Sequence, residues 1–329
     1  MRCSEERGDT VLRLGVFQLT AGGPRPGVYA DGYLYDVSAV GAAWASSFDA
    51  LLTLSRAELI SRLAALDLHG LPRYGLPGAD LTEMPSAGQQ EAGSGARLLA
   101  PLGNQEVWAA GVTYVRSREA RTEEAVTKDV YQRVYEAPRP ELFFKAMASR
   151  MVGPGGSVAI RGDSTWDVPE PELALVLNTA LEVVGYTIGN DMSSRSIEGE
   201  NPLYLPQAKV YTDCCALGPL VTVATDDLDA RNLEIGMTIT RAGATVFSGA
   251  TSTADLHRTF DDLTEHLGRY NTFPHGAILL TGTGLVPPAS FTLRDDDEVT
   301  ISIASIGSLR NTVRRLTAPL SPKRVWARP

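Results

Sequence analysis

The sequence has few cysteines and no long apolar run, and these absences exclude several classes of protein. Three cysteines occur in 329 residues, two of them adjacent at Cys214 and Cys215, which is too few for a disulfide framework. No apolar stretch reaches the roughly 18 to 20 residues that a membrane-spanning helix needs. The first residues, MRCSEERGD, are charged and lack an apolar core, so we expect no secretory signal. We therefore expect a cytoplasmic protein with no membrane partner.

Basic residues are also fewer than acidic residues. The chain has 30 basic and 39 acidic residues, a net charge of −9 and a sequence pI near 5.1. This balance argues against a nucleic-acid partner but leaves open a local basic pocket for an anionic small molecule. The apolar and charged fractions, 43% and 21%, are typical of a globular protein with one large or two moderate domains.

The first hundred residues predict a small N-terminal α/β domain with a linker. Residues 11–38 alternate between apolar and polar residues in two stretches, which predicts antiparallel strands with a hairpin turn at Asp31 and Gly32. Ser55 and Glu58 form a capping box that opens an amphipathic helix. Residues 67–100 are rich in Gly, Pro, Ser and Gln, which favours a linker. We therefore divide the chain into residues 1–100 and a catalytic domain at 101–329.

The second region is predicted to be mainly β. Residues 117–138 are charged and helix-prone, which fits either a solvated surface helix or a mobile lid over a site. The glycines after Val152 make a turn rather than a phosphate loop, because no Lys-Ser/Thr pair follows them. No alternation of strands and helices supports a nucleotide fold. We expect strands within 106–114, 231–249, 276–284 and 299–309, and a helix at 253–269.

Two carboxylates two residues apart, Glu170 and Glu172, are the first candidate functional residues. On a strand their side chains would share one face, and Pro171 between them, which has no N–H, favours an edge strand or a bulged strand entry. Like charges held so close are unfavourable unless a cation lies between them. Asp191 follows 19 residues later and Lys209 a further 18.

These residue types predict a site for a hard divalent cation. Carboxylate oxygens suit Mg²⁺, Mn²⁺ or Ca²⁺ better than zinc, and none of the four histidines lies in this stretch. The alternative is that Glu170 and Glu172 are surface carboxylates on a loop and that Asp191 is a turn or cap residue. Spacing alone does not decide between these interpretations.

Ordered motifs resemble the fumarylacetoacetate hydrolase superfamily from about residue 105 to 315. They are E-x-E-L at Glu170, G-Y-T-x-x-N-D-x-S-x-R ending at Arg195, Lys209 and then L-G-P, flanked by Gly111–Tyr114, Phe144-Lys145, the T-G-T turn of 280–284 and G-x-L-x-N at 307–311. The resemblance implies an α+β, mainly β fold, a mixed β-roll, assembled as a homo-oligomer such as a dimer or tetramer. It also implies that Glu170, Glu172 and Asp191 bind Mg²⁺, or Mn²⁺ or Ca²⁺.

Three longer segments resemble the 2-keto-3-deoxy-D-arabinonate dehydratase branch of this superfamily. They are RPELFFKA, WDVPEPELALVL and IEGENPLYLPQAKVY. Enzymes of that branch remove water from a 2-keto-3-deoxy pentonate and produce 2-oxoglutarate semialdehyde. Hydrolases of the superfamily carry a histidine where this chain has Ser117, so no obvious base is left to activate a hydrolytic water.

The resemblance therefore implies a lyase that acts on a small 2-keto acid through a metal-stabilised enolate. Glu141 and Lys209 match positions for the proton transfers, and Lys209 can equally anchor the substrate carboxylate or neutralise the three acids. We expect Arg195 to pair locally with a carboxylate. The candidate substrate contacts, some of which can instead serve packing or support, are Ser117, Arg118, Lys145, Tyr204, Gln207 and Thr283.

Other functions on the same fold stay open at this stage. One is another reaction of the superfamily, such as acylpyruvate-type hydrolysis, decarboxylation or isomerisation. A second is an enzyme of secondary metabolism with a larger keto acid as its substrate. A third is a non-catalytic binding protein. Retention of the three carboxylates with Lys209 speaks against the third.

Overall fold

The computed structural model of the chain describes residues 11–76, 96–115 and 128–317, and β-strands dominate this part. The strands are β1 Arg13–Leu19, β2 Arg25–Ala30, β3 Tyr33–Asp36, β4 Arg73–Gly75, β5 Ala96–Leu99, β6 Glu106–Gly111, β7 Glu141–Ala146, β8 Met151–Val152, β9 Ser157–Ile160, β10 Asp167–Val168, β11 Pro171–Leu177, β12 Val183–Asp191, β13 Ser193–Ser194, β14 Cys215–Val223, β15 Glu234–Arg241, β16 Ala244–Ser252, β17 Ala277–Leu280, β18 Glu298–Ile303 and β19 Gly307–Arg315. The α-helices are α1 Phe48–Leu51, α2 Arg56–Ala64, α5 Lys128–Glu136, α6 Arg195–Glu200, α7 Leu205–Lys209 and α8 Phe260–Gly268. The prediction of an α+β, mainly β fold is confirmed.

Two mixed sheets form the body of the protein. In the described residues the larger sheet runs β4-β3-β2-β1-β14-β12-β11-β17-β6-β7, with β5 paired to β1 and β8 paired to β14. The second sheet runs β16-β15-β18-β19-β9, and a short ladder joins β10 to β13. Neighbouring strands are mostly antiparallel, but β17–β6, β19–β9 and β14–β8 are parallel.

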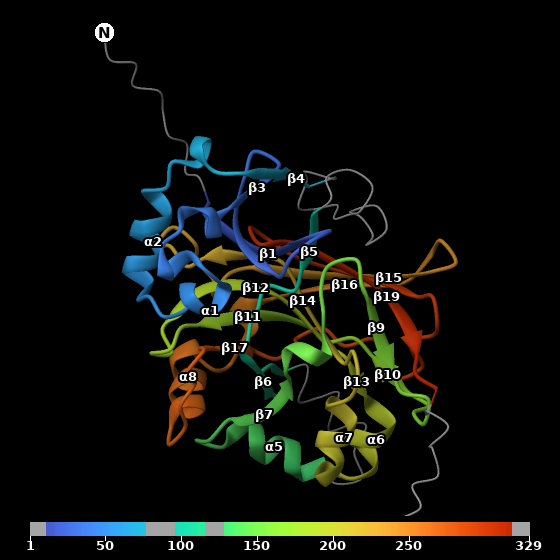
Figure 1. Cartoon of the computed structure of the whole chain (residues 1–329). Coiled ribbons are helices and arrows are strands. Elements are labelled where there is room, and N and C mark those ends of the chain that lie inside the picture. Colours follow the sequence, from blue (N-terminus) through green and yellow to red (C-terminus); the bar gives the residue numbers. More distant parts are fainter. Residues whose placement is uncertain (1–10, 77–95, 116–127, 318–329) are drawn as a thin grey trace, which may run out of the picture.

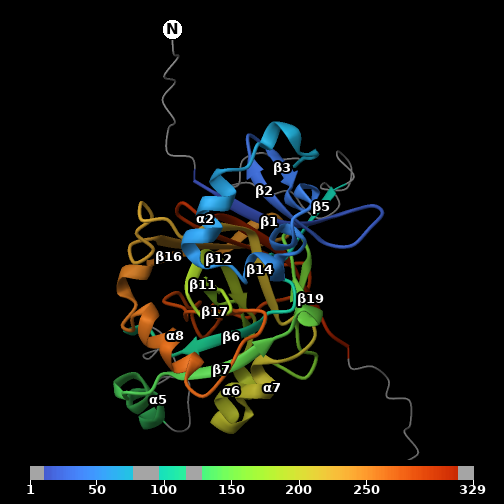
Figure 2. The same cartoon turned by 60° about the vertical axis from the view of Figure 1, so that its left-hand side comes forward.

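The core lies where the two sheets meet. Strands β11, β12 and β14 of the larger sheet contact β15, β18 and β19 of the second. Every residue of β11 and β14 is buried, which explains their nearly continuous apolar sequence. Helices α5, α6 and α7 lie at the end of the molecule opposite the N-terminal strands and α2 (Figures 1 and 2).

The N-terminal predictions are confirmed at the level of single elements. Asp31 and Gly32 both have positive φ, 49° and 80°, in the turn between β2 and β3, and Ser55 and Glu58 form the predicted capping box on α2. Residues at both ends of the predicted linker pair into the sheet instead, as β4 and β5. Because β1 pairs with β14, the N-terminal strands extend the sheet of the catalytic region, and the division at residue 100 stays a prediction.

Two predictions of local structure are wrong. The helix expected over residues 253–269 begins only at Phe260, because the Thr259 side chain caps it by accepting from the Asp262 N–H, while Leu256 bridges to Tyr114. Strand β11 is not an edge strand, since it lies between β12 and β17. Pro171 is tolerated there because it is the first residue of the strand, and the bulge expected at this entry is absent, since the register shift of β11 lies between Val176 and Leu177.

Candidate active site

The three carboxylates predicted to bind a cation lie together at one end of the β11–β12 pair. Glu170 immediately precedes β11, Glu172 lies on it and Asp191 ends β12. The antiparallel pairing brings them together: Pro171 lies opposite Asn190, and the Asp191 N–H donates to the Glu170 carbonyl at 3.0 Å. Carboxylate oxygens of all three lie within 4.8 Å of one another, and each residue is at most 3% exposed. The alternative of surface carboxylates is therefore wrong.

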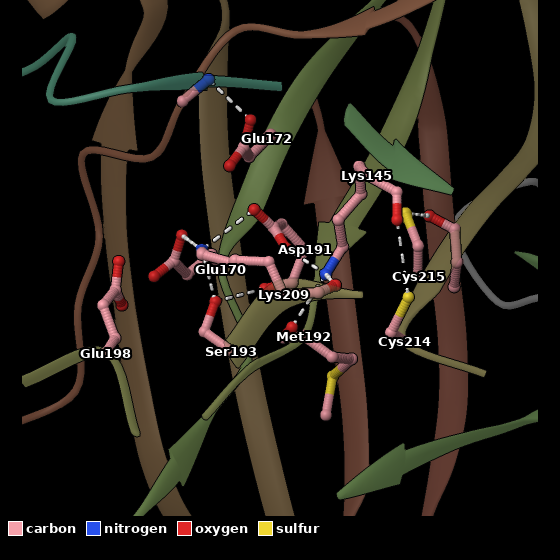
Figure 3. A network of polar contacts seen from close by, with 12 residues as sticks. Lys145, Glu170, Glu172, Asp191, Met192, Ser193, Glu198, Lys209, Cys214 and Cys215 are labelled. Atoms are coloured by element: carbon pink, nitrogen blue, oxygen red, sulfur yellow. Dashed lines mark hydrogen bonds and ion pairs between the residues drawn. The ribbon is translucent and has the colours of Figure 1, made fainter. Parts of the chain in front are cut away.

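Lys209, the last residue of α7, reaches into this cluster. Its Nζ lies 2.8 Å from Glu170 Oε2, 2.9 Å from Asp191 Oδ2 and 2.5 Å from Ser193 Oγ (Figure 3). The side chain is fully buried, so it is not a surface lysine. In this arrangement it neutralises two of the acids, which is one of the roles expected for it.

Two further cations contact the same acids from other sides. Arg195, the first residue of α6, places Nη2 2.8 Å from Glu170 Oε1, which confirms that it pairs with a carboxylate. Lys145, on β7, places Nζ 2.6 Å from Asp191 Oδ1. Both oxygens of Glu170 and both of Asp191 therefore face a positive charge.

Glu172 differs from its two neighbours. Among the described residues no Lys or Arg forms an ion pair with it, and the Gly282 N–H donates to its Oε2 at 2.5 Å. Burial, followed by the negative charges of Asp191 and Glu170, raises the pKa of Glu172 well above its usual value, although Lys209 and the Gly282 N–H oppose this. A buried acid that lacks an ion-pair partner, beside two other carboxylates, is suited to a divalent cation.

Glu141, the residue proposed for proton transfer, is the first residue of β7. It lies opposite Gly111 of β6 in the sheet register, and a Cβ atom on Gly111 would come within 2.1 Å of the Glu141 carboxylate. A side chain at position 111 would therefore displace Glu141. This contact gives a physical reason for the glycine of the Gly111–Tyr114 motif.

The structure places the remaining candidates differently. Thr283 follows Gly282, whose N–H donates to Glu172. Its hydroxyl forms hydrogen bonds with the backbone of Leu285. Tyr204 and Gln207 are exposed; Gln207 lines a surface pocket of about 390 Å³ next to α7. Ser117 and Arg118 lie outside the described residues. The substrate roles of all these residues stay predictions.

Sequence reasoning missed two polar residues that contact the cations of the cluster and one buried acid close to Glu170 in sequence. Ser193 contacts Lys209, and Glu198, only 3% exposed, lies 3.9 Å from Arg195 across one turn of α6. Asp167 is a fully buried carboxylate three residues before Glu170. The spacing of three between Arg195 and Glu198 was a usable signal, whereas burial of Asp167 depends on tertiary packing.

Comparison with known proteins assigns the family. Residues 106–314 match the fumarylacetoacetate (FAA) hydrolase C-terminal family. The chain is 54% identical over 213 residues to a probable 2-keto-3-deoxyxylonate dehydratase of Haloferax volcanii, covering 65% of this chain and 73% of the relative. It is 43% identical over 223 residues to a 2-dehydro-3-deoxy-D-arabinonate dehydratase of Saccharolobus solfataricus, covering 67% and 75%.

Solved structures agree with this assignment. A hexagonal crystal form of 2-keto-3-deoxyarabinonate dehydratase superposes with a TM-score of 0.73 at 31% identity, covering 93% of this chain and all of that one. A 2-keto-3-deoxy-D-arabinonate dehydratase complexed with magnesium and 2,5-dioxopentanoate gives 0.71 at the same identity and coverage. The predicted mixed β-roll is therefore confirmed. This chain belongs to the fumarylacetoacetate hydrolase family.

Proposed function

We propose that this protein is a divalent-cation-dependent hydro-lyase that converts a 2-keto-3-deoxy pentonate into 2-oxoglutarate semialdehyde. The observation that carries the proposal is the buried cluster of Glu170, Glu172 and Asp191 with Lys209 against it. The cluster lies within the segment that matches the family, in a chain that is 54% and 43% identical to two dehydratases.

The three carboxylates are the residues that would hold the cation. They offer only oxygen ligands, which suit Mg²⁺, with Mn²⁺ or Ca²⁺ as alternatives. Burial, followed by the charges of Asp191 and Glu170, raises the pKa of Glu172, and among the described residues no Lys or Arg pairs with its carboxylate, so the donor set fits such an ion. When bound there, a divalent cation supplies Lewis-acid polarisation of the keto group of the substrate.

Glu141 and Lys209 carry the proton transfers in this proposal. Glu141 takes a proton from C3, the C4–O bond breaks, and the hydroxyl leaves as water with a proton from Lys209. A proton returned to C3 and one lost from C5 convert the C3–C4 double bond into an enol at C4–C5. Tautomerisation of this enol gives the aldehyde, so the net change is the loss of one water molecule.

A turnover assay tests the proposal directly. The purified protein, with Mg²⁺, is incubated with 2-keto-3-deoxy-D-arabinonate, and the aldehyde is detected by hydrazone formation and mass spectrometry. C4 is the only stereocentre of this acid, so its enantiomer is the matched control. Failure of the folded, metal-loaded protein to form the semialdehyde would contradict the proposal. Cleavage of an acylpyruvate instead would assign the chain to hydrolysis.

Two broader predictions accompany this function. No helix among the described residues is long and apolar enough to cross a membrane. A cytoplasmic location and a homo-oligomeric assembly, dimer or tetramer, stay predictions. Size-exclusion chromatography with light scattering tests the assembly.

A further inference from the structure

Lys145 is a buried cation to which the mechanism above gives no role. Its side chain is 0% exposed, and three oxygens surround Nζ: the Met192 carbonyl at 2.9 Å, the Lys209 carbonyl at 2.5 Å and Asp191 Oδ1 at 2.6 Å (Figure 3). The contact with Asp191 is a close ion pair with an angle too poor for a good hydrogen bond. Two of the three N–H donors of this ammonium group therefore bond to backbone carbonyls, and the group is fully buried against the Asp191 carboxylate.

The three oxygens belong to two segments that form the candidate active site. Asp191 and Met192 lie at the end of β12, and Lys209 is the last residue of α7. Lys145 contacts Oδ1 of Asp191, whereas the amine of Lys209 contacts Oδ2. One ammonium group therefore fixes the orientation of a candidate metal ligand and the backbone of a candidate catalytic residue.

The ammonium group of Lys145 is fully buried, and one carboxylate and two carbonyl oxygens contact it. A buried ammonium group is strongly unfavourable unless it is paired and hydrogen-bonded, as this one is.

Resting on the dehydratase function above, we propose that Lys145 is a positioning residue. It orients Asp191 for the cation and Lys209 for proton transfer, and it does not contact the substrate. Two other roles are chemically distinct. Lys145 as a substrate contact, the role considered from the sequence, would affect substrate binding alone. Lys145 as a simple counter-charge would weaken cation binding, because it repels a second positive ion.

The sign of one measurement separates the roles. Lys145→Met removes the charge at similar size, and Mg²⁺ or Mn²⁺ affinity is measured by calorimetry without substrate. If Lys145 positions Asp191, cation affinity falls about 10-fold or more, as for other residues that orient a metal ligand. The kcat at saturating cation falls as well, because Lys209 is displaced, while the KM for substrate changes little. Tighter cation binding would contradict the proposal, and so would an unchanged affinity with a raised KM.

Two variants control for loss of stability. Arg25→Met removes the cation from another buried carboxylate, Asp36, held at 2.8 Å between strands β2 and β3, and we expect it to leave cation affinity unchanged. Lys145→Arg keeps the positive charge but replaces the compact ammonium group. We expect its cation affinity to lie between those of Lys145→Met and the unsubstituted protein. If Lys145→Met does not fold, an affinity of Lys145→Arg equal to that of the unsubstituted protein would contradict the proposal. Cation binding needs no turnover, so an inactive protein that binds Mg²⁺ would disprove the dehydratase function, while the cation affinities of the variants would still support or contradict the positioning role of Lys145.

Discussion

Glu170 and Asp167 lie three residues apart, and both are buried, yet their surroundings are opposite. Glu170 lies 2.8 Å from both Arg195 and Lys209. Neither oxygen of Asp167 accepts a hydrogen bond of good geometry from a described residue, although the Ser164 hydroxyl is close. Burial raises the pKa of Asp167 to about 6, against the weaker opposing effects of Ser164 and Arg315. The comparison indicates that cations balance Glu170 at the candidate site, whereas no described Lys or Arg forms an ion pair with Asp167.

The largest effect is expected inside the carboxylate cluster. Glu172→Gln removes one of three charged ligands, so we expect divalent-cation affinity to fall at least about 10-fold and dehydration at fixed Mg²⁺ to fall further. Calorimetry measures the affinity. Glu234→Gln, an exposed acid on β15, is the control and should behave like the unsubstituted protein. Unchanged cation binding in Glu172→Gln would contradict the prediction that Glu172 binds the cation.

The residues of this cluster were largely predictable, whereas their mutual contacts were not. Glu170, Glu172, Asp191 and Lys209 could be predicted because their spacing and their order along the chain are visible in the sequence motifs. The ion pair between Lys145 and Asp191 depends on β7 reaching the end of β12, although no hydrogen-bonded ladder joins these two strands. Such tertiary contacts leave no periodic trace in the sequence.

The errors in local structure have a similar origin. Pro171 suggested an edge strand because proline has no N–H to donate to a neighbouring strand. A proline is also tolerated as the first residue of a strand, and Pro171 has this position in the central strand β11. The apolar spacing from Leu256 onward matched a helix, yet Leu256 is buried through its bridge to Tyr114 instead. In both cases a tertiary contact determined the structure that local pattern left ambiguous.

The next effect concerns stability. Arg195→Met removes one of the two cations that contact Glu170 among the described residues, and it removes the cation that lies 3.9 Å from Glu198. Because removing Arg195 takes a cation away from a buried carboxylate, we expect the free energy of unfolding to fall by about 3 kcal/mol in urea titrations.

The control for this prediction is an exposed ion pair. Arg269→Met breaks the contact with Glu265 on the surface and should cost at most about 1 kcal/mol. Adding Glu170→Gln to Arg195→Met should recover part of the loss, since the acid is then neutral. If Arg195→Met and Arg269→Met lowered the free energy of unfolding equally, burial of the pair between Glu170 and Arg195 would add nothing to stability.

The smallest effect is expected for Asp167→Asn, which should raise the free energy of unfolding, whereas Arg195→Met should lower it. Its folded-state pKa of about 6 lies above the ordinary 3.8, so ionisation destabilises the folded state as the pH rises through 6. Asp167→Asn removes this penalty. We expect its free energy of unfolding to match that of the unsubstituted protein near pH 4 and to exceed it at pH 8 by at most about 3 kcal/mol. Asp297→Asn, which removes a paired buried acid, should instead be destabilising at pH 8. A loss of stability in both variants at pH 8 would mean that Asp167 has a favourable partner, and the contrast with Glu170 would fail.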